Sequence, residues 1–290
     1  MRFYTIEKDS KQIVCVGFGE KEIYPVSDFG VNFRDMNSLI DTLTLNECKE
    51  IFCAKNGKNP ISLDDVKVLA PIPYPKQDIL CIGVNYTEHA KESQNFHKEK
   101  FHKTQDAIYF CKRTSPANYD GGVIPLHSEL TQKIDYECEL GVILGKDAKN
   151  VTRENAWQYI FGYTIINDIS ARDVQKGRGQ FYFGKSLDGF SPMGPCIVTA
   201  DEIGENPALS IKCYVNGELR QNSTTNLLIH DIPDILCDLT RGITLRAGTI
   251  IATGTPSGVG MGFDPPRFLQ SKDKIVCEIE KIGSLTSIMA

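Results

Sequence analysis

The sequence predicts an α+β protein that is mainly β, with a small β-rich N-terminal domain over residues 1–72 and a larger domain over residues 73–290. Short apolar runs of β type recur along the chain, and few helical segments separate them. The run P-I-P-Y-P at residues 71–75 fits neither a helix nor a central strand and marks the domain boundary. A doubly wound parallel sheet is a poor fit because regular alternation of strand and helix is missing.

The N-terminal domain is predicted to contain two strands, at residues 2–7 and 12–18, followed by two helices. The helices are expected at residues 36–43 and 46–54, with Asn46 as the N-cap of the second.

The larger domain is predicted to be dominated by strands, interrupted by two helices. The helices are expected at residues 152–159, with Thr152 as N-cap, and at residues 233–241, between Asp231 and a stop at Gly242. The strands are expected at residues 78–84, 107–112, 134–144, 162–168, 196–199, 210–215, 249–252 and 274–279.

Composition excludes several classes of protein. The 290 residues carry a net charge of −5, which argues against a nucleic-acid partner. No apolar run is long enough to predict a membrane span, and charges begin too early for a secretory signal. The ten cysteines lie singly in apolar runs without a C-x-x-C pair, so we expect a cytoplasmic protein with free thiols and no structural zinc.

The segment Y-E-C-E-L-G-V-I-L at residues 136–144 alternates apolar and other residues, as a strand with one buried face does. Glu137 and Glu139 then project from the same face, roughly 6.6 Å apart along the strand. A divalent cation between them would remove their repulsion. The alternative is that the two glutamates solvate the open face of a sheet.

Asp168 ends the apolar strand predicted at residues 162–168 and could join the two glutamates. Three carboxylates without His or Cys suit Mg²⁺, Mn²⁺ or Ca²⁺ and disfavour Zn²⁺. The alternative for Asp168 is a turn or a helix cap.

A second group of polar residues suggests acid–base chemistry. His89 and Glu92 are three apart in a predicted helix, where a carboxylate on the imidazole would make a general base. A surface His–Glu pair is the alternative. The segment G-K-S-L-D-G has Asp188 where the G-x-S-x-G of a serine hydrolase requires glycine, which excludes that class. Lys185 could instead be an electrophilic cation beside a bound anion. The loop G-T-P-S-G-V-G at residues 254–260 lacks the P-loop lysine but has N–H groups and Thr255 that could hold a small carboxylate.

These motifs resemble, in this order, those of the fumarylacetoacetate hydrolase family. The resemblance covers about residues 73–280 and rests on six collinear motifs: G-x-N-Y-x-x-H-x-x-E (83–92), D-Y-E-x-E-L-G-V (135–142), D-x-S-A-R-D-V-Q (168–175), G-K-S-x-D-G-F-x-P-x-G-P (184–195), V-N-G-E-L-R-Q (215–221) and G-T-P-S-G-V-G (254–260). It implies a layered mixed β-sheet fold of that family's type, a homodimer, and a bacterial-type member similar to 2-hydroxyhepta-2,4-diene-1,7-dioate isomerases and acylpyruvate hydrolases.

The resemblance also implies roles for individual residues. Glu137, Glu139 and Asp168 match the family's Mg²⁺ or Mn²⁺ ligands. His89 and Glu92 match its water-activating pair, and Lys185 matches a lysine beside the metal. The substrate-contacting positions of the family are matched by Gln175 and Thr255.

The implied activity is that of a divalent-metal-dependent enzyme acting on a 2-oxo or 2-hydroxy-dienoic acid through a metal-stabilised enolate, by C–C bond hydrolysis or isomerisation. The alternative is a decarboxylase or lyase of a small oxo-acid such as oxaloacetate. Two further alternatives are a binding protein without turnover and a nucleotide-binding module built on residues 254–260.

One departure from the family concerns specificity. Val84 stands where some members have an arginine, so we expect poor turnover of small diacids such as oxaloacetate. Residues 93–105 are rich in His and Lys and are expected to form a lid that brings charge to longer substrates.

Overall fold

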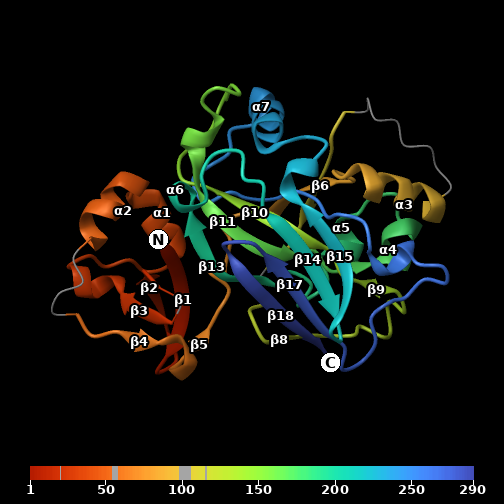
Figure 1. Cartoon of the computed structure of the whole chain (residues 1–290), viewed down its shortest axis with the longest axis horizontal. Coiled ribbons are helices and arrows are strands. Elements are labelled where there is room, and N and C mark those ends of the chain that lie inside the picture. The colour runs from red at the N-terminus through yellow and green to blue at the C-terminus, as the bar shows by residue number, and fades with distance from the viewer. Residues whose placement is uncertain (20, 54–57, 98–105, 115) are drawn as a thin grey trace.

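The structure is a computed structural model that describes residues 1–19, 21–53, 58–97, 106–114 and 116–290. Within these ranges two mixed β-sheets dominate, which confirms the predicted fold class. The larger sheet has the strand order β4-β3-β2-β1-β13-β11-β10-β16-β6-β7, with β5 paired to β1. The smaller sheet has the order β15-β14-β17-β18-β8 and packs across β10, β11 and β13 of the larger one (Figure 1).

The strands of the large sheet are β1 Arg2–Lys8, β2 Lys11–Gly17, β3 Glu22–Pro25, β4 Ile61–Ser62, β5 Lys67–Val68, β6 Ile79–Gly83, β7 Ile108–Lys112, β10 Cys138–Leu144, β11 Ile160–Asn167, β13 Met193–Thr199 and β16 Ile250–Ala252. Those of the small sheet are β8 Gly122–Ile124, β14 Ser210–Val215, β15 Glu218–Thr224, β17 Lys274–Ile279 and β18 Gly283–Met289, and a separate pair comprises β9 Ile134–Asp135 and β12 Ser170–Ala171. The helices are α1 Met36–Thr42, α2 Leu45–Phe52, α3 Thr87–His97, α4 Arg172–Gly177, α5 Tyr182–Lys185, α6 Ala200–Ile203 and α7 Ile232–Gly242.

The N-terminal segment continues the large sheet. β1 pairs antiparallel with β13, with Phe3 opposite Ile197. Helices α1 and α2 cover this end of the sheet, at the left of Figure 1, over a core that includes Phe3, Phe52 and Phe161. The division at residue 73 stays a prediction. None of the described helices is both long and apolar enough to cross a bilayer.

The β10 strand is buried on both faces, because it lies between two apolar cores. Leu140, Val142 and Leu144 belong to the core beneath the small sheet, whereas Ile143 belongs to the core beneath α1 and α2. The expectation of a strand with one buried face was therefore wrong: all seven residues of β10 are buried. The expected strand 134–144 is also broken after Asp135, whose carboxylate accepts a hydrogen bond from the N–H of Tyr136 at 3.0 Å.

Hydrogen bonds of side chains to the nearby backbone determine where helices begin, and the sequence analysis misplaced two of these starts. The N-cap of α2 is Thr44 rather than Asn46, because Thr44 and Glu47 form a reciprocal capping box. The helix expected at residues 152–159 is a turn followed by a 3₁₀ helix, Ala156–Tyr159. There Asn155 accepts the N–H of Thr152 at 2.9 Å, a local bond that competes with helix formation. Helix α7 begins after Asp231, as predicted.

We predict that Phe161→Ala will lower the free energy of unfolding by about 3–5 kcal/mol, the usual cost of truncating a buried phenylalanine. The Phe161 ring is 1% exposed, and its centroid lies 5.6 Å from that of Phe3, so the change opens a cavity where β11 meets the N-terminal strand. Denaturant titration measures the effect. Leu227→Ala, at a site 57% exposed, is the control and should shift stability by less than about 0.5 kcal/mol. Equal midpoints for the two variants would contradict the prediction.

Candidate active site with a carboxylate cluster

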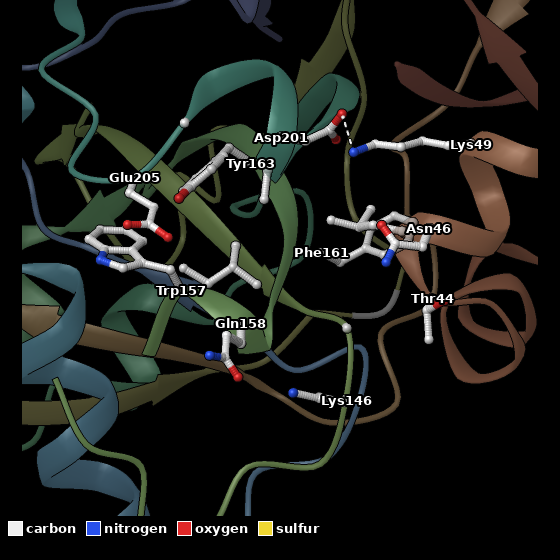
Figure 2. Close-up of a pocket in the computed structure, with 15 residues that line it drawn as sticks. Thr44, Asn46, Lys49, Lys146, Trp157, Gln158, Phe161, Tyr163, Asp201 and Glu205 are labelled. Carbon is white, nitrogen blue, oxygen red and sulfur yellow. Dashed lines mark ion pairs between the residues drawn. The ribbon is translucent and has the colours of Figure 1, made fainter. Parts of the chain in front are cut away.

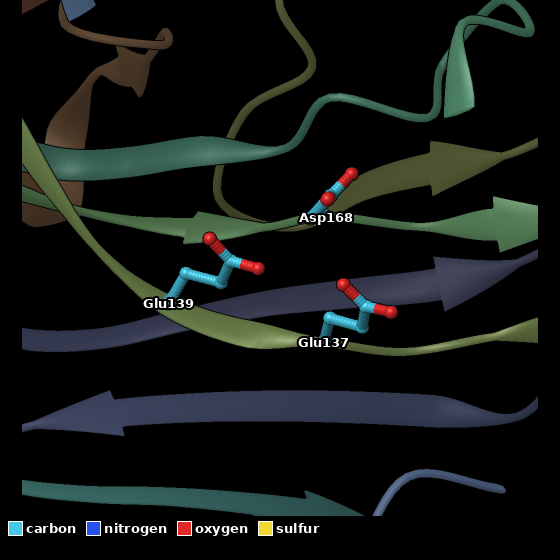
Figure 3. Close-up of side chains that lie close together, drawn as sticks. All are labelled: Glu137, Glu139 and Asp168. Atoms are coloured by element: carbon cyan, nitrogen blue, oxygen red, sulfur yellow. The ribbon is translucent and has the colours of Figure 1, made fainter. Parts of the chain in front are cut away.

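Glu137, Glu139 and Asp168 lie together where β10 begins and β11 ends (Figure 3). One carboxylate oxygen of each lies within 4.8 Å of the others, and all three residues are buried. The antiparallel register of β10 and β11 brings them together, because Cys138 lies opposite Asn167. The N–H of Asp168 donates to the carbonyl of Glu137 at 2.8 Å, which fixes the two acids side by side.

Three buried cations surround this cluster. Lys185 Nζ lies 2.7 Å from Glu137 and 2.6 Å from Asp168. Lys112 Nζ lies 2.5 Å from the other oxygen of Asp168. Arg172 lies 2.6 Å from Glu137. Each of the three cations is thereby removed from water with a carboxylate in contact, as buried ions require.

The three cations compensate the charges of the three carboxylates unevenly. Burial raises the pKa of Glu137, but Lys185, Arg172 and His89 outweigh it and hold that pKa below its usual value. Burial, Asp168 and Glu137 together raise the pKa of Glu139 well above its usual value. Among the described residues Glu139 has no ion-pair partner, and its carboxylate accepts one backbone N–H, from Gly254 at 2.8 Å.

The donor set fits a hard divalent cation. It consists of oxygen atoms only, and a divalent cation beside Glu139 would offset the repulsion that the three side-chain cations leave uncompensated. Lys185 stays protonated there, because Asp168 and Glu137 outweigh burial and raise its pKa.

His89 and Glu92 form a buried pair on α3. His89 Nδ1 lies 3.0 Å from Glu92 Oε2, and the side chains are 5% and 13% exposed. A carboxylate can only accept, so Nδ1 carries the proton and Nε2 is left as the basic nitrogen. The geometry is that of an enclosed pair rather than the surface pair that was the alternative. The lid predicted at residues 93–105 lies mostly outside the described residues.

A cavity of about 370 Å³ joins these groups. His89, Glu137, Glu139, Lys185 and Arg172 line its polar part. Val84, Phe110 and Phe181 line an apolar wall. Val84 has φ of +54°, a conformation that is rare and strained for a β-branched residue.

The two predicted substrate contacts, Gln175 and Thr255, also line the cavity. Gln175 accepts a long hydrogen bond from Arg172 at 3.3 Å. The Thr255 hydroxyl donates to the carbonyl of Cys138 at 3.1 Å and accepts from Gln221 at 2.7 Å, so one lone pair at most is left for a ligand. Their roles stay predictions.

Sequence reasoning missed Lys112, Arg172 and Asp135. Arg172 bridges Glu137 and Asp135, and Asp135 is fully buried. Each has a signal in the sequence: Lys112 ends an apolar strand, Arg172 lies four residues after Asp168, and Asp135 opens the D-Y-E motif. A charge at the end of an apolar strand needs a partner, a rule that would have marked Lys112 without saying which acid it contacts.

Three N–H groups of the loop at residues 254–260 are not free to bind a phosphate. The N–H groups of Gly254, Gly258 and Gly260 already donate to carboxylates of the chain itself, which are those of Glu139, Glu92 and Asp135. The nucleotide-binding alternative therefore loses these three donors.

A second cavity, of about 470 Å³, lies between α2 and β11 (Figure 2). Its charged residues lie at the rim, where Lys49 pairs with Asp201 at 3.2 Å. It contains neither the carboxylate cluster nor the His89–Glu92 pair, so the candidate site is the smaller cavity.

The mixed β-sheet scaffold and the buried acidic site define an enzyme that acts on small molecules. A family model described as fumarylacetoacetate (FAA) hydrolase C-terminal matches residues 78–289. The chain therefore belongs to the fumarylacetoacetate hydrolase family.

Relatives in this family carry different activities. The chain is 46% identical over 231 residues to an oxaloacetate tautomerase from Bacillus subtilis, covering 80% of this chain and 75% of that protein. It superposes on a fumarylacetoacetate hydrolase from Exiguobacterium antarcticum with a TM-score of 0.85 at 36% identity, covering 100% and 99% of the two chains. It also superposes on a maleylpyruvate hydrolase from Sphingobium, described in complex with manganese(II) and pyruvate, with a TM-score of 0.78 at 29% identity and the same coverage.

We predict that Mn²⁺ will raise the melting temperature of the unmodified protein. At a free Mn²⁺ concentration of 100 times the dissociation constant, binding should add about 2.7 kcal/mol to the free energy of unfolding. In Glu139→Gln the shift should be lost. The metal-free variant should melt higher than the metal-free wild type at neutral pH, because it lacks an acid whose pKa burial, Asp168 and Glu137 raise, and such a raised pKa costs folding free energy above the pKa of the unfolded acid. Differential scanning fluorimetry with and without chelator measures both effects. Equal Mn²⁺ shifts in the two proteins would contradict the assignment.

Proposed function

We propose that this enzyme catalyses proton transfer on a small 2-oxo acid, and that its principal reaction is keto–enol tautomerisation of a diacid of the oxaloacetate type. The observation that carries the proposal is that the buried His89, paired with Glu92, lines one cavity with two acids of the carboxylate cluster. Lys185 and Arg172 line the same cavity. The 46% identity to an oxaloacetate tautomerase supports the choice of reaction. The cavity volume of about 370 Å³ is near the lower end of the usual range of about 300–1,000 Å³, which favours a small substrate.

Glu137, Glu139 and Asp168 would hold the divalent metal, Mg²⁺ or Mn²⁺. When bound, that cation supplies a Lewis acid that lowers the energy of negative charge on the carboxylate and 2-oxo oxygens of the substrate. Lys185, which contacts two of the three acids, adds positive charge where an enolate oxygen develops.

His89 is the proposed base. Glu92 holds the proton on Nδ1, so Nε2 removes a proton from C3 of the keto acid and the protonated ring returns one to the enolate oxygen. Both half-steps need a base that is shielded from bulk water, and His89 is 4% exposed.

Arg172 is the proposed partner of a substrate carboxylate. Its Nη2 is buried, and no described residue accepts a hydrogen bond from it. The expectation that Val84 leaves small diacids without a cation overlooked this guanidinium. Val84 instead adds to the apolar wall, and we no longer expect poor turnover of oxaloacetate on that ground.

C–C bond hydrolysis of an acylpyruvate is the second candidate. The structural similarity to a maleylpyruvate hydrolase supports it, and the same pair could activate water in place of abstracting a proton. Isomerisation of a hydroxy-dienoic acid in aromatic-compound catabolism and decarboxylation of oxaloacetate use the same enolate. We also propose a homodimer in the cytoplasm; Val123 and Ile288, paired across β8 and β18 and both exposed, support an apolar contact surface.

We expect kcat/KM for oxaloacetate tautomerisation to exceed that for pyruvate release from an acylpyruvate, because the cavity is small and offers Arg172 to a second carboxylate. Loss of enol absorbance measures the first reaction, and a coupled lactate dehydrogenase assay measures the second. Pyruvate formation from oxaloacetate itself would identify decarboxylation. Faster release of pyruvate from the acylpyruvate would favour the hydrolase instead.

We predict that His89→Ala and Glu92→Gln will each lower kcat by ~10²–10⁴ while changing Mn²⁺ affinity little, since neither residue belongs to the carboxylate cluster. Glu88→Gln is a matched control, because Glu88 pairs with Lys91 on the exposed side of the same helix. Steady-state kinetics and Mn²⁺ titration separate the two effects. Parallel losses of turnover and metal affinity would show that the pair has a different role.

A further inference from the structure

The loop from Gly254 to Met261 is bonded to carboxylates at three separate places. The N–H of Gly254 donates to Glu139 at 2.8 Å, and that of Gly258 donates to Glu92 at 3.0 Å. The N–H groups of Gly260 and Met261 donate to Asp135 at 2.6 and 3.0 Å. Hydrogen bonds to ionised acceptors are the stronger kind, so the loop connects the acid cluster rigidly to α3.

Glu92 fits against this loop without space to spare. One of its oxygens accepts the Gly258 N–H, and the other lies 3.0 Å from His89. A Cβ atom on Gly262 would stand 1.8 Å from Glu92 Oε1 and 2.1 Å from Cδ. The backbone of Gly262 is not in the left-handed region, so it is the Glu92 carboxylate, rather than φ, that demands glycine there.

Asp135 holds the loop in place. Its carboxylate accepts the two N–H groups at Gly260 and Met261 and also the Nε of Arg172, at 2.9 Å. Arg172 in turn contacts Glu137. The position of the loop is therefore tied to the acid cluster through Gly254 and through Arg172.

We infer that Gly262 and the N–H of Gly258 form a seat for the Glu92 carboxylate, and that this seat positions His89 for proton transfer. Gly258 and Gly262 are positioning residues that act through Glu92. The base role of His89 rests on the proposed function, whereas the seat itself rests on the contacts alone.

The test is Gly262→Ala. The atoms that the new methyl would meet are the far end of a flexible side chain, so Glu92 can swing away at little cost to the fold. We expect kcat for oxaloacetate tautomerisation to fall by roughly 10²-fold, toward the value of Glu92→Ala. Gly242→Ala is the matched control, because a Cβ there meets nothing within 4 Å and φ is again not left-handed.

A double-mutant cycle separates positioning from a general effect on the loop. In a Glu92→Ala background the methyl has no carboxylate to displace, so Gly262→Ala should change kcat by less than about twofold. An equal loss in both backgrounds, or wild-type kcat in Gly262→Ala, would overturn the inference. If Gly262→Ala does not fold, the Gly262→Ala/Glu92→Ala protein should fold again, and its failure to do so would equally overturn the seat.

A readout without turnover distinguishes failure of the seat from failure of the proposed function. In ¹⁵N NMR spectra of histidine-labelled protein, assigned with His89→Gln, His89 should show a protonated Nδ1 and a bare Nε2 in the neutral ring. Gly262→Ala should mix the two tautomers as Glu92→Ala does, and Gly242→Ala should not. If Gly262→Ala changes the His89 tautomer in this way but the wild-type protein turns over no oxo acid, the result would support the seat for Glu92 and reject the proposed function. An unchanged tautomer in Gly262→Ala would reject the seat.

Discussion

The repulsion among three buried carboxylates is the constraint around which the rest of the site is arranged. One carboxylate oxygen each of Glu137, Glu139 and Asp168 lies within 4.8 Å of the others. Three cations, Lys112, Arg172 and Lys185, surround the cluster. Removing one partner of such a buried pair usually costs about 3–5 kcal/mol, so each cation is needed where it is. The elements that carry the cations, β7, α4 and α5, must in turn pack around this cluster. Charge compensation thus determines local architecture as well as chemistry.

The same constraint explains why the glycine loop is shaped as it is. The Glu139 carboxylate, for which no described residue supplies a cation in contact, is satisfied by the N–H of Gly254, and Glu92 and Asp135 are satisfied by N–H groups farther along the loop. A side chain on Gly258 would meet the carbonyl oxygen of Arg220 at 2.0 Å, and φ there is +99°. Glycine is required at this position because the backbone of Arg220 leaves no space for a Cβ atom and because φ is left-handed.

The alternation of apolar residues and local motifs were enough to predict most strands. They also placed Glu137 and Glu139 on one face, because side chains two residues apart on a strand share a face. Sequence could not show that both faces of β10 are buried, since that depends on a sheet formed by residues far along the chain. β15 was missed because its residues are mostly polar, although the Asn216–Gly217 turn before it, with both φ values positive, is a strong hairpin signal. The ion-pair partners Lys112 and Arg172 are 56 residues and 35 residues from the acids they contact, a pairing that only the fold determines.

The antiparallel pairing of β1 with β13 constrains how the N-terminal part of the chain can evolve. Without β1, the backbone of β13 would present an unpaired edge to solvent, and such edges recruit strands from other molecules. The family match begins at residue 78, so β1 lies outside the matched region whereas β13 lies inside it. A chain without β1 would have to protect this edge in another way. Relatives with unrelated N-terminal segments are therefore expected to converge on the same solution, a strand laid against β13.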